Sequence, residues 1–182
     1  NWPQLISKFT MGAMAYSQAV DNYLDEKLEA NTKPNNKPYK DGKPYTGKEH
    51  VWDEGFGYFG AAAHTLSLTA DQAYGIAKRK DMASADANGD GVVDLKSEMV
   101  FGPAYYAAAF DRSGSKTTNY LNTIMQAYMD GRQLITSAKG AILTDAQRSS
   151  LKAHASIIES NWEQVLAEAV FKYAGSTYKD IN

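Results

Sequence analysis

The segment TGKEHVWDEGFGYFG, residues 46–60, combines a clear helix start with a dense run of aromatic side chains. Thr46 and Glu49 have the spacing of a capping box, in which each side chain bonds the backbone N–H of the other residue. At about 100° per residue, the residues on one apolar stripe are Trp52, Phe56, Phe59, Ala63 and Leu66. Small residues on the opposite side would let another backbone come close. We therefore predict a central helix that is covered on both sides.

Apolar residues recur at helical spacing through most of the remaining chain. Pro3 suits the first turn of a helix, and Thr69–Gln72 and Thr144–Gln147 are two further capping boxes. The predicted helices cover roughly residues 3–30, 46–66, 69–80, 100–109, 120–139 and 144–175. No segment alternates as a half-buried strand does. The prediction is an all-α helical bundle forming a single domain over residues 1–182.

The amino-acid composition limits the classes of protein to which this chain can belong. A formal charge of −2 and a pI near 5.9 give no electrostatic reason to expect nucleic-acid binding. The absence of cysteine excludes disulfides and thiolate chemistry and is compatible with a bacterial envelope protein. No apolar run reaches the roughly 20 residues of a membrane span. With no initiator Met and no signal peptide, the chain is expected to be a fragment of a longer protein.

Residues 31–45 are rich in proline, asparagine and lysine and are predicted to form an exposed loop. The loop contains Lys33, Lys37, Lys40 and Lys43. Such a basic loop could bind an anionic partner, or it could be a solvated connection.

The segment DANGDGVVDLKSE, residues 86–98, resembles an EF-hand calcium loop. Gly91 stands at its sixth position, where the backbone turns with positive φ, and the Val92 carbonyl stands at the seventh. Side-chain oxygens at positions one, three, five and nine come from Asp86, Asn88, Asp90 and Asp94. Calcium prefers six to eight oxygen ligands, whereas Mg²⁺ keeps more of its water. We predict a Ca²⁺ site between two helices; the alternative is a solvated turn.

The end of this loop departs from the usual pattern. Position twelve, normally a bidentate glutamate, is Ser97, and Glu98 follows it. Either a longer loop brings Glu98 to the ion, or water or a distant side chain completes the coordination.

His50, Asp53 and Glu54 form a second candidate site, for a transition metal such as iron or copper or for another ligand. One helical turn puts the imidazole and the carboxylates on the same side, as in metal sites of helical bundles. Further ligands must then come from other helices. Candidates by residue type are Asp21, Glu26, Glu159 and Glu163. The alternative is a structural His–Asp pair.

Catalytic motifs are not apparent, because no Cys nucleophile, nucleophile elbow or His-Glu-x-x-His pattern is present. The sequence therefore favours a non-enzymatic protein. Its 12 tyrosines and 3 tryptophans could line a carbohydrate-binding groove, although aromatic residues at helical spacing also form cores.

Three segments carry a resemblance to a known family: residues 18–24, residues 49–60, and residues 86–98 with the Phe101-Gly pair that follows. They resemble uncharacterised bacterial envelope proteins classed as a domain of unknown function, and the most specific element is His-x-Trp-Asp-Glu-x-Phe-Gly-Tyr-Phe-Gly. The resemblance implies a longer protein, often a lipoprotein, in a setting similar to that of imelysin-like proteins associated with iron uptake. Imelysin-like proteins carry His-x-x-Glu, whereas Asp53 is the third residue after His50 here.

These observations lead to three functional hypotheses. The first is a non-enzymatic calcium-binding envelope protein, periplasmic, anchored to the outer membrane or secreted, that assists metal acquisition, with iron as the expected metal. The second is a helical module that binds a polysaccharide or an envelope protein and uses calcium as a structural ion. The third is an imelysin-like metalloenzyme.

Overall fold

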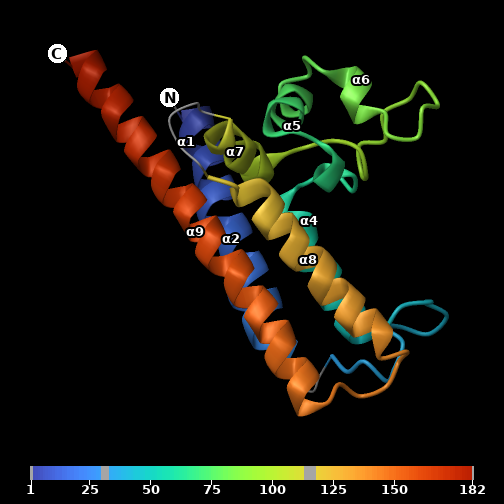
Figure 1. Cartoon of the computed structure of the whole chain (residues 1–182). Coiled ribbons are helices and arrows are strands. Elements are labelled where there is room, and N and C mark those ends of the chain that lie inside the picture. The colour runs from blue at the N-terminus through green and yellow to red at the C-terminus, as the bar shows by residue number, and fades with distance from the viewer. Residues whose placement is uncertain (1, 30–32, 113–117, 182) are drawn as a thin grey trace.

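The computed structural model describes residues 2–29, 33–112 and 118–181 and is helical (Figure 1). Within these ranges no β-strand is present, although an isolated antiparallel bridge joins Pro38 and Thr46. The α-helices are α1 (Trp2–Phe9), α2 (Ala15–Ser17), α3 (Lys27–Glu29), α4 (Gly47–Phe59), α5 (Ala70–Ala77), α6 (Met82–Ala85), α7 (Gly102–Asp111), α8 (Tyr120–Ser137) and α9 (Asp145–Ile181). A 3-10 turn, η3 (Thr65–Ser67), follows α4.

The first predicted helix is one continuous helical rod. Two π-helical stretches, η1 (Thr10–Met14) and η2 (Gln18–Glu26), join α1, α2 and α3, and the residues at the joints keep right-handed helical dihedral angles. Only part of the rod buries its apolar side chains in the core. The buried members are Ala19, Val20, Leu24 and Leu28.

The first half of this rod corrects the sequence prediction. The apolar spacing that predicted a helix over residues 3–30 includes Leu5, Ile6 and Phe9, but each of these side chains is about 60% exposed. Val170 and Phe171 on α9 are also exposed, and Figure 1 shows the C-terminal end of α9 projecting beyond the other helices. The C-terminal end of α9 thus extends past the helices that could cover it.

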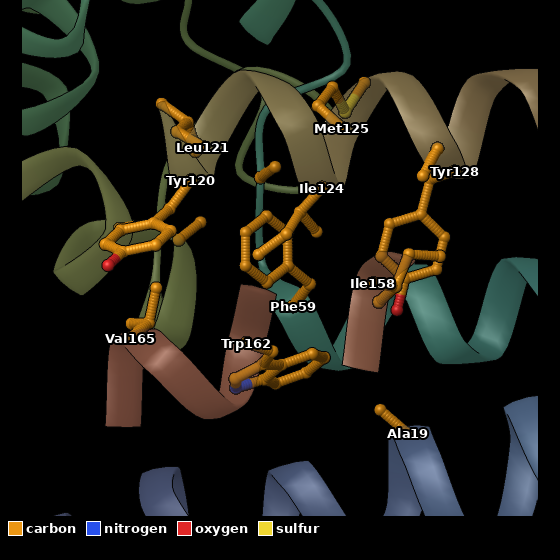
Figure 2. Packing of buried hydrophobic residues seen from close by; sticks show 14 of the residues in the cluster. Ala19, Phe59, Tyr120, Leu121, Ile124, Met125, Tyr128, Ile158, Trp162 and Val165 are labelled. Carbon is orange, nitrogen blue, oxygen red and sulfur yellow. The ribbon is translucent and has the colours of Figure 1, made fainter. Parts of the chain in front are cut away.

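The core lies between α4, α8, α9 and η2. Figure 2 shows Phe59 of α4, Ile124 of α8 and Trp162 of α9 pointing into one apolar layer, with Ala19 of the first rod on its far side. The Phe59 and Trp162 rings meet edge to face, with their centroids 5.2 Å apart. The opposite side of α4, which was predicted to lie against another backbone, is open, because Asp53 and Gly57 are exposed. The prediction of a helix covered on both sides is therefore wrong for that side.

Two glycines allow the helices around α4 to come close. A Cβ on Gly131 of α8 would lie 2.1 Å from Cζ2 of Trp52, so the indole occupies the space of the missing side chain. Elsewhere on α4, a Cβ on Gly55 would lie 3.2 Å from Leu24 of η2. The Trp52 indole N–H also donates a hydrogen bond of 2.8 Å to the Tyr128 carbonyl. At the centre of the bundle, Trp52 thus takes part in both close helix packing and a hydrogen bond to α8.

Helix α4 is shorter than predicted. Its capping box is present, but the helix ends at Phe59 because Gly60 adopts the left-handed conformation, with φ of 80°. Ala63 and Leu66, which were expected on the buried stripe, are exposed beyond this end. The capping boxes at Thr69 and Thr144 are also present and open α5 and α9.

Residues 33–46 are more firmly held than an exposed loop would be. Asn35 is 3% exposed. Its side-chain amide donates to the carbonyls of Ile135 and Ala141, and its side-chain oxygen accepts from the Thr46 hydroxyl. These bonds attach the loop to the end of α8 and the turn after it. The prediction of an exposed loop is therefore wrong at this position.

Helices α5 and α6 and the loop that follows them lie to one side of the bundle (Figure 1). The short helix α6 was not predicted from the sequence. Val93, within the loop, is partly buried against the core and anchors the loop there. None of the described helices combines the length and apolar character needed to cross a membrane.

Candidate functional site

The loop at residues 86–98 is organised by its own acidic side chains. The Asp86 carboxylate accepts hydrogen bonds from the backbone N–H groups of Gly89, Asp90 and Gly91, at distances of 2.8 to 3.2 Å. Gly89 and Gly91 have φ of 74° and 83°, a conformation that favours glycine. The N-terminal half of the loop therefore curls around the Asp86 carboxylate.

Glu98 closes the loop from its other end. Its side chain is buried, with the residue only 4% exposed. One carboxylate oxygen accepts from the Ala87 N–H at 3.1 Å and the other from the Asp94 N–H at 2.8 Å. Ser97, at the usual glutamate position, instead donates its hydroxyl to Asp94. The structure thus brings Glu98, and not Ser97, to the interior of the loop.

The donor set of this loop fits a hard cation by chemical type. Asn88, Asp90 and Asp94 each accept one backbone hydrogen bond through a side-chain oxygen, from Asp90, Val92 and Lys96 respectively. A carboxylate has about four lone-pair sites, so coordinating capacity remains on each aspartate. The side chain of Val92 is 69% exposed, and its proposed role uses only the backbone carbonyl.

These oxygens do not all converge on one centre. Among the residues that the structure describes, no three His, Asp or Glu side chains are grouped closely enough to hold an ion. Asp90 and Asp94 are exposed. Their short side chains can therefore turn towards Glu98 without displacing a packed neighbour.

His50, Asp53 and Glu54 do lie together, in a shallow hollow of about 310 Å³ that Gly57 and Tyr58 complete. The His50 Nε2 atom is 3.6 Å from the Glu54 carboxylate. Partial burial lowers the pKa of His50, although Glu54 acts to raise it. A neutral imidazole at physiological pH follows, and this form can accept a hydrogen bond or bind a metal.

Aromatic rings from outside α4 enclose this histidine. The ring centroids of Tyr39 and His50 are 3.5 Å apart, and Tyr45 lies near-parallel to His50 at 5.9 Å. Tyr58 pairs with Tyr23 of η2, with centroids 5.8 Å apart. The sequence does not indicate that these tyrosines belong to the site; Tyr39 and Tyr45 each directly follow a proline in residues 38–45.

Asp53 is less available than its neighbours. Its carboxylate accepts from Arg132 Nε at 2.8 Å, and the same guanidinium bonds Glu49 at 2.8 Å. Arg132 of α8 therefore ties two carboxylates of α4 to the bundle. The partner of Asp53 is thus Arg132 and not the histidine of the expected His–Asp pair, and this ion pair makes Asp53 less available as a metal ligand.

The carboxylates suggested as partners for His50 lie elsewhere. Glu163 accepts from the Tyr16 hydroxyl at 3.0 Å, and Asp21 and Glu159 line another hollow between η2 and α9. The pKa of Glu159 is raised by burial and by the nearby charges of Glu163, Asp25 and Asp21. Glu26 is exposed on η2. The acidic groups near His50 are Glu54 and Asp53 of its own helix.

Comparison with known proteins identifies a family but no activity. A family model described as "Domain of unknown function (DUF4856)" matches residues 1–179. The chain belongs to this family. No curated protein and no solved structure matches it. The predicted membership of an uncharacterised family is therefore confirmed, and the functional argument rests on the residues of this chain.

Proposed function

We propose that this member of the family is a non-enzymatic calcium-binding protein and that the loop at residues 86–98 holds one structural Ca²⁺. The observation that carries the proposal is Glu98, a buried carboxylate bonded to backbone groups at both ends of the loop. It supports the longer version of the loop, in which Glu98 replaces the usual glutamate at position twelve. The oxygen ligands would be Asp86, Asn88, Asp90, Asp94 and Glu98, with the Val92 carbonyl.

An ion bound in this loop would also stabilise the fold. Val93 packs on the core, while residues on both sides of it belong to the exposed loop. An ion that binds the folded loop and not the unfolded chain stabilises the protein by about 2.7 kcal/mol at one hundred times its dissociation constant. A bacterial envelope location, where free calcium is available, is part of the same proposal.

Thermal melting with and without calcium tests the proposal. We expect a chelator to lower Tm, calcium to restore it, and elemental analysis to find one calcium per chain. Asp90→Ala should remove the response to calcium, whereas Asp41→Ala, which removes an exposed carboxylate outside the loop, should keep it. A parent protein whose melting curve ignores both chelator and calcium would refute the proposal.

A second candidate function is carbohydrate binding at the His50 hollow. Tyrosine rings beside carboxylates and a neutral imidazole offer a stacking surface and hydrogen-bonding groups for sugar hydroxyls. This arrangement favours the binding module over metal acquisition, because Asp53 is held by Arg132 and the other carboxylates lie elsewhere.

Ligand titrations distinguish these uses of the hollow. Tyr58→Ala should weaken binding of a soluble envelope polysaccharide roughly tenfold, as loss of about 1.4 kcal/mol of stacking predicts. Retention of iron, copper or zinc by the parent protein, abolished in His50→Ala, would instead support the metal-acquisition role. Turnover of a substrate that depends on such a metal would support the imelysin-like enzyme.

A further inference from the structure

A cavity lined by basic residues lies at the end of the bundle opposite the projecting tip of α9. It has a volume of about 670 Å³, within the range of small-molecule sites. Figure 1 shows two segments that line it, residues 33–37 and the turn between α8 and α9, side by side at the same end. The amide of Asn35, which bonds the Ala141 carbonyl at 3.0 Å, joins these segments. This hydrogen bond therefore holds the two sides of the cavity together.

Most of the charged residues that line the cavity are basic. Among the described residues that line it, Asp145 is the one acidic residue, and its carboxylate is 95% exposed and paired with Arg148. The basic residues of the lining are Lys33, Lys37, Lys48, Arg148 and Lys152. Five basic residues thus line one cavity of a protein whose formal charge is −2.

Lys48 is the most informative of these residues because it is buried and forms no ion pair with a carboxylate of the described residues. The residue is 7% exposed, and its ammonium donates to the carbonyls of Lys27 and Leu28 at the end of α3. Burial, and then the charge of Arg148, lower the pKa of Lys48 to about 8. An ammonium has three donors, so one remains after the two carbonyls are satisfied.

The uncharged lining of the cavity is mixed, with polar Asn35, Asn36 and Ser149 beside an apolar group of side chains. Leu28, Leu143 and Leu151 are each 5% exposed or less and form its base. A ligand that fits both parts of the lining carries a negative charge on one end and an apolar group on the other. A free cation in a buried site costs desolvation energy unless an anion compensates it.

We propose that this cavity binds a small organic anion, a phosphate ester or carboxylate, whose charge lies against Lys48 and Arg148 and whose apolar part lies on Leu143 and Leu151. The site goes beyond the calcium loop and the His50 hollow and shares no residue with either. It also gives a role to the basic loop, whose lysines the sequence alone could not assign.

Calorimetric titration with phenyl phosphate, on the protein as it stands and in calcium-free buffer, tests this site. We expect one binding site per chain, tighter binding than inorganic phosphate shows, and no binding of uncharged phenol. Arg148→Gln should weaken phenyl phosphate roughly tenfold, the equivalent of one charge-assisted hydrogen bond, and Lys48→Met by at least as much. Lys43→Gln, which removes a charge from the same loop outside the cavity, is the matched control and should bind as the parent does.

The pH dependence separates a specific site from general attraction. Lys33 and Lys37 on the loop and Asp145, Arg148 and Lys152 on α9 share the cavity with Lys48. Because phenyl phosphate is a dianion above its second pKa near 6, its affinity should fall as pH rises through about 8, where Lys48 loses its proton. In Lys48→Met this fall should disappear. If that variant does not fold, Arg148→Gln and the pH profile of the parent still decide the matter.

Three results would overturn the proposal. They are an absence of saturable binding in the parent, an equal loss of affinity in Lys43→Gln and Arg148→Gln, and an affinity that stays constant from about pH 7 to 9.5. Equal affinities for phenyl phosphate and inorganic phosphate would remove the apolar half of the proposed ligand.

Discussion

The contact between α4 and α8 and the loop at residues 86–98 are stabilised in different ways. At the helix contact, Trp52 is 1% exposed and fills the space left by Gly131. In the loop, Val92 and Leu95 are 69% and 67% exposed, and side-chain oxygens bonded to backbone N–H groups fix its shape. Packing therefore fixes the bundle, whereas hydrogen bonds from backbone N–H groups to acidic side chains fix the loop.

Gly131→Ala should give the largest effect on stability. The new Cβ would lie 2.1 Å from the Trp52 ring, so the indole or the helix must move. Overpacking of this kind costs about 3 kcal/mol, and urea unfolding monitored by circular dichroism would measure it. The expected loss should be the same with and without calcium, because the contact lies outside the loop.

Gly57→Ala is the matched control for this substitution. Gly57 is also helical, on the exposed side of α4, and a Cβ there would meet nothing within 4 Å. Removal of glycine from a helix interior should raise stability by roughly 0.5–1 kcal/mol. If Gly131→Ala is as well tolerated as Gly57→Ala, close packing does not fix the central contact.

Glu98→Gln should give an intermediate effect that stays within the loop. An amide group in place of the carboxylate puts an NH₂ against one of the two N–H donors, those of Ala87 and Asp94. An unsatisfied buried donor costs about 1–2 kcal/mol. Hydrogen exchange should accelerate at the Ala87 and Asp94 amides while the Trp52 indole N–H stays protected. Equal acceleration at all three sites would mean that loop and bundle unfold together.

The predictable parts of this fold are those with local signals. Capping boxes at Thr46, Thr69 and Thr144 use residues three apart, and the structure shows all three. The contact of Trp52 with Gly131 joins residues 79 positions apart, and α8 alone does not show which glycine an indole will cover. The buried side chains of Asn35 and Lys48 depend in the same way on distant carbonyl groups.

In the candidate sites, too, local sequence patterns were predictive and contacts with distant residues were not. Alternating oxygens and glycines within 13 residues indicated the loop, and only the place of Glu98 needed the structure. At His50, one helical turn placed Glu54 correctly, but the enclosing Tyr39 and Tyr45 come from the preceding loop and Arg132 comes from α8. A spacing rule along one helix carries no information about side chains that reach it from other elements.

Acid titration should give the smallest effect and compares the two regions directly. At Glu49 in the packed region, burial acts to raise the pKa, but the Thr46 N–H and Arg132 outweigh it and lower the pKa. In the loop, the Lys96 N–H and then the Ser97 hydroxyl lower the pKa of Asp94. Each carboxylate therefore adds stability above its unfolded pKa, near 4.3 for Glu and 3.9 for Asp. This stability is lost as pH falls through the lower folded value.

The two groups differ in exposure, so their contributions should differ in size. The Glu49 side chain is 13% exposed, whereas Asp94 is open to solvent, which screens its interactions. Unfolding measured in urea from about pH 6 to 2 should show a distinctly flatter acid limb in Glu49→Gln, which keeps the capping box. Asp94→Asn should change that limb only slightly in calcium-free buffer. A larger change in Asp94→Asn than in Glu49→Gln would contradict the comparison, because it would show that the loop, and not the packed helices, limits stability in acid.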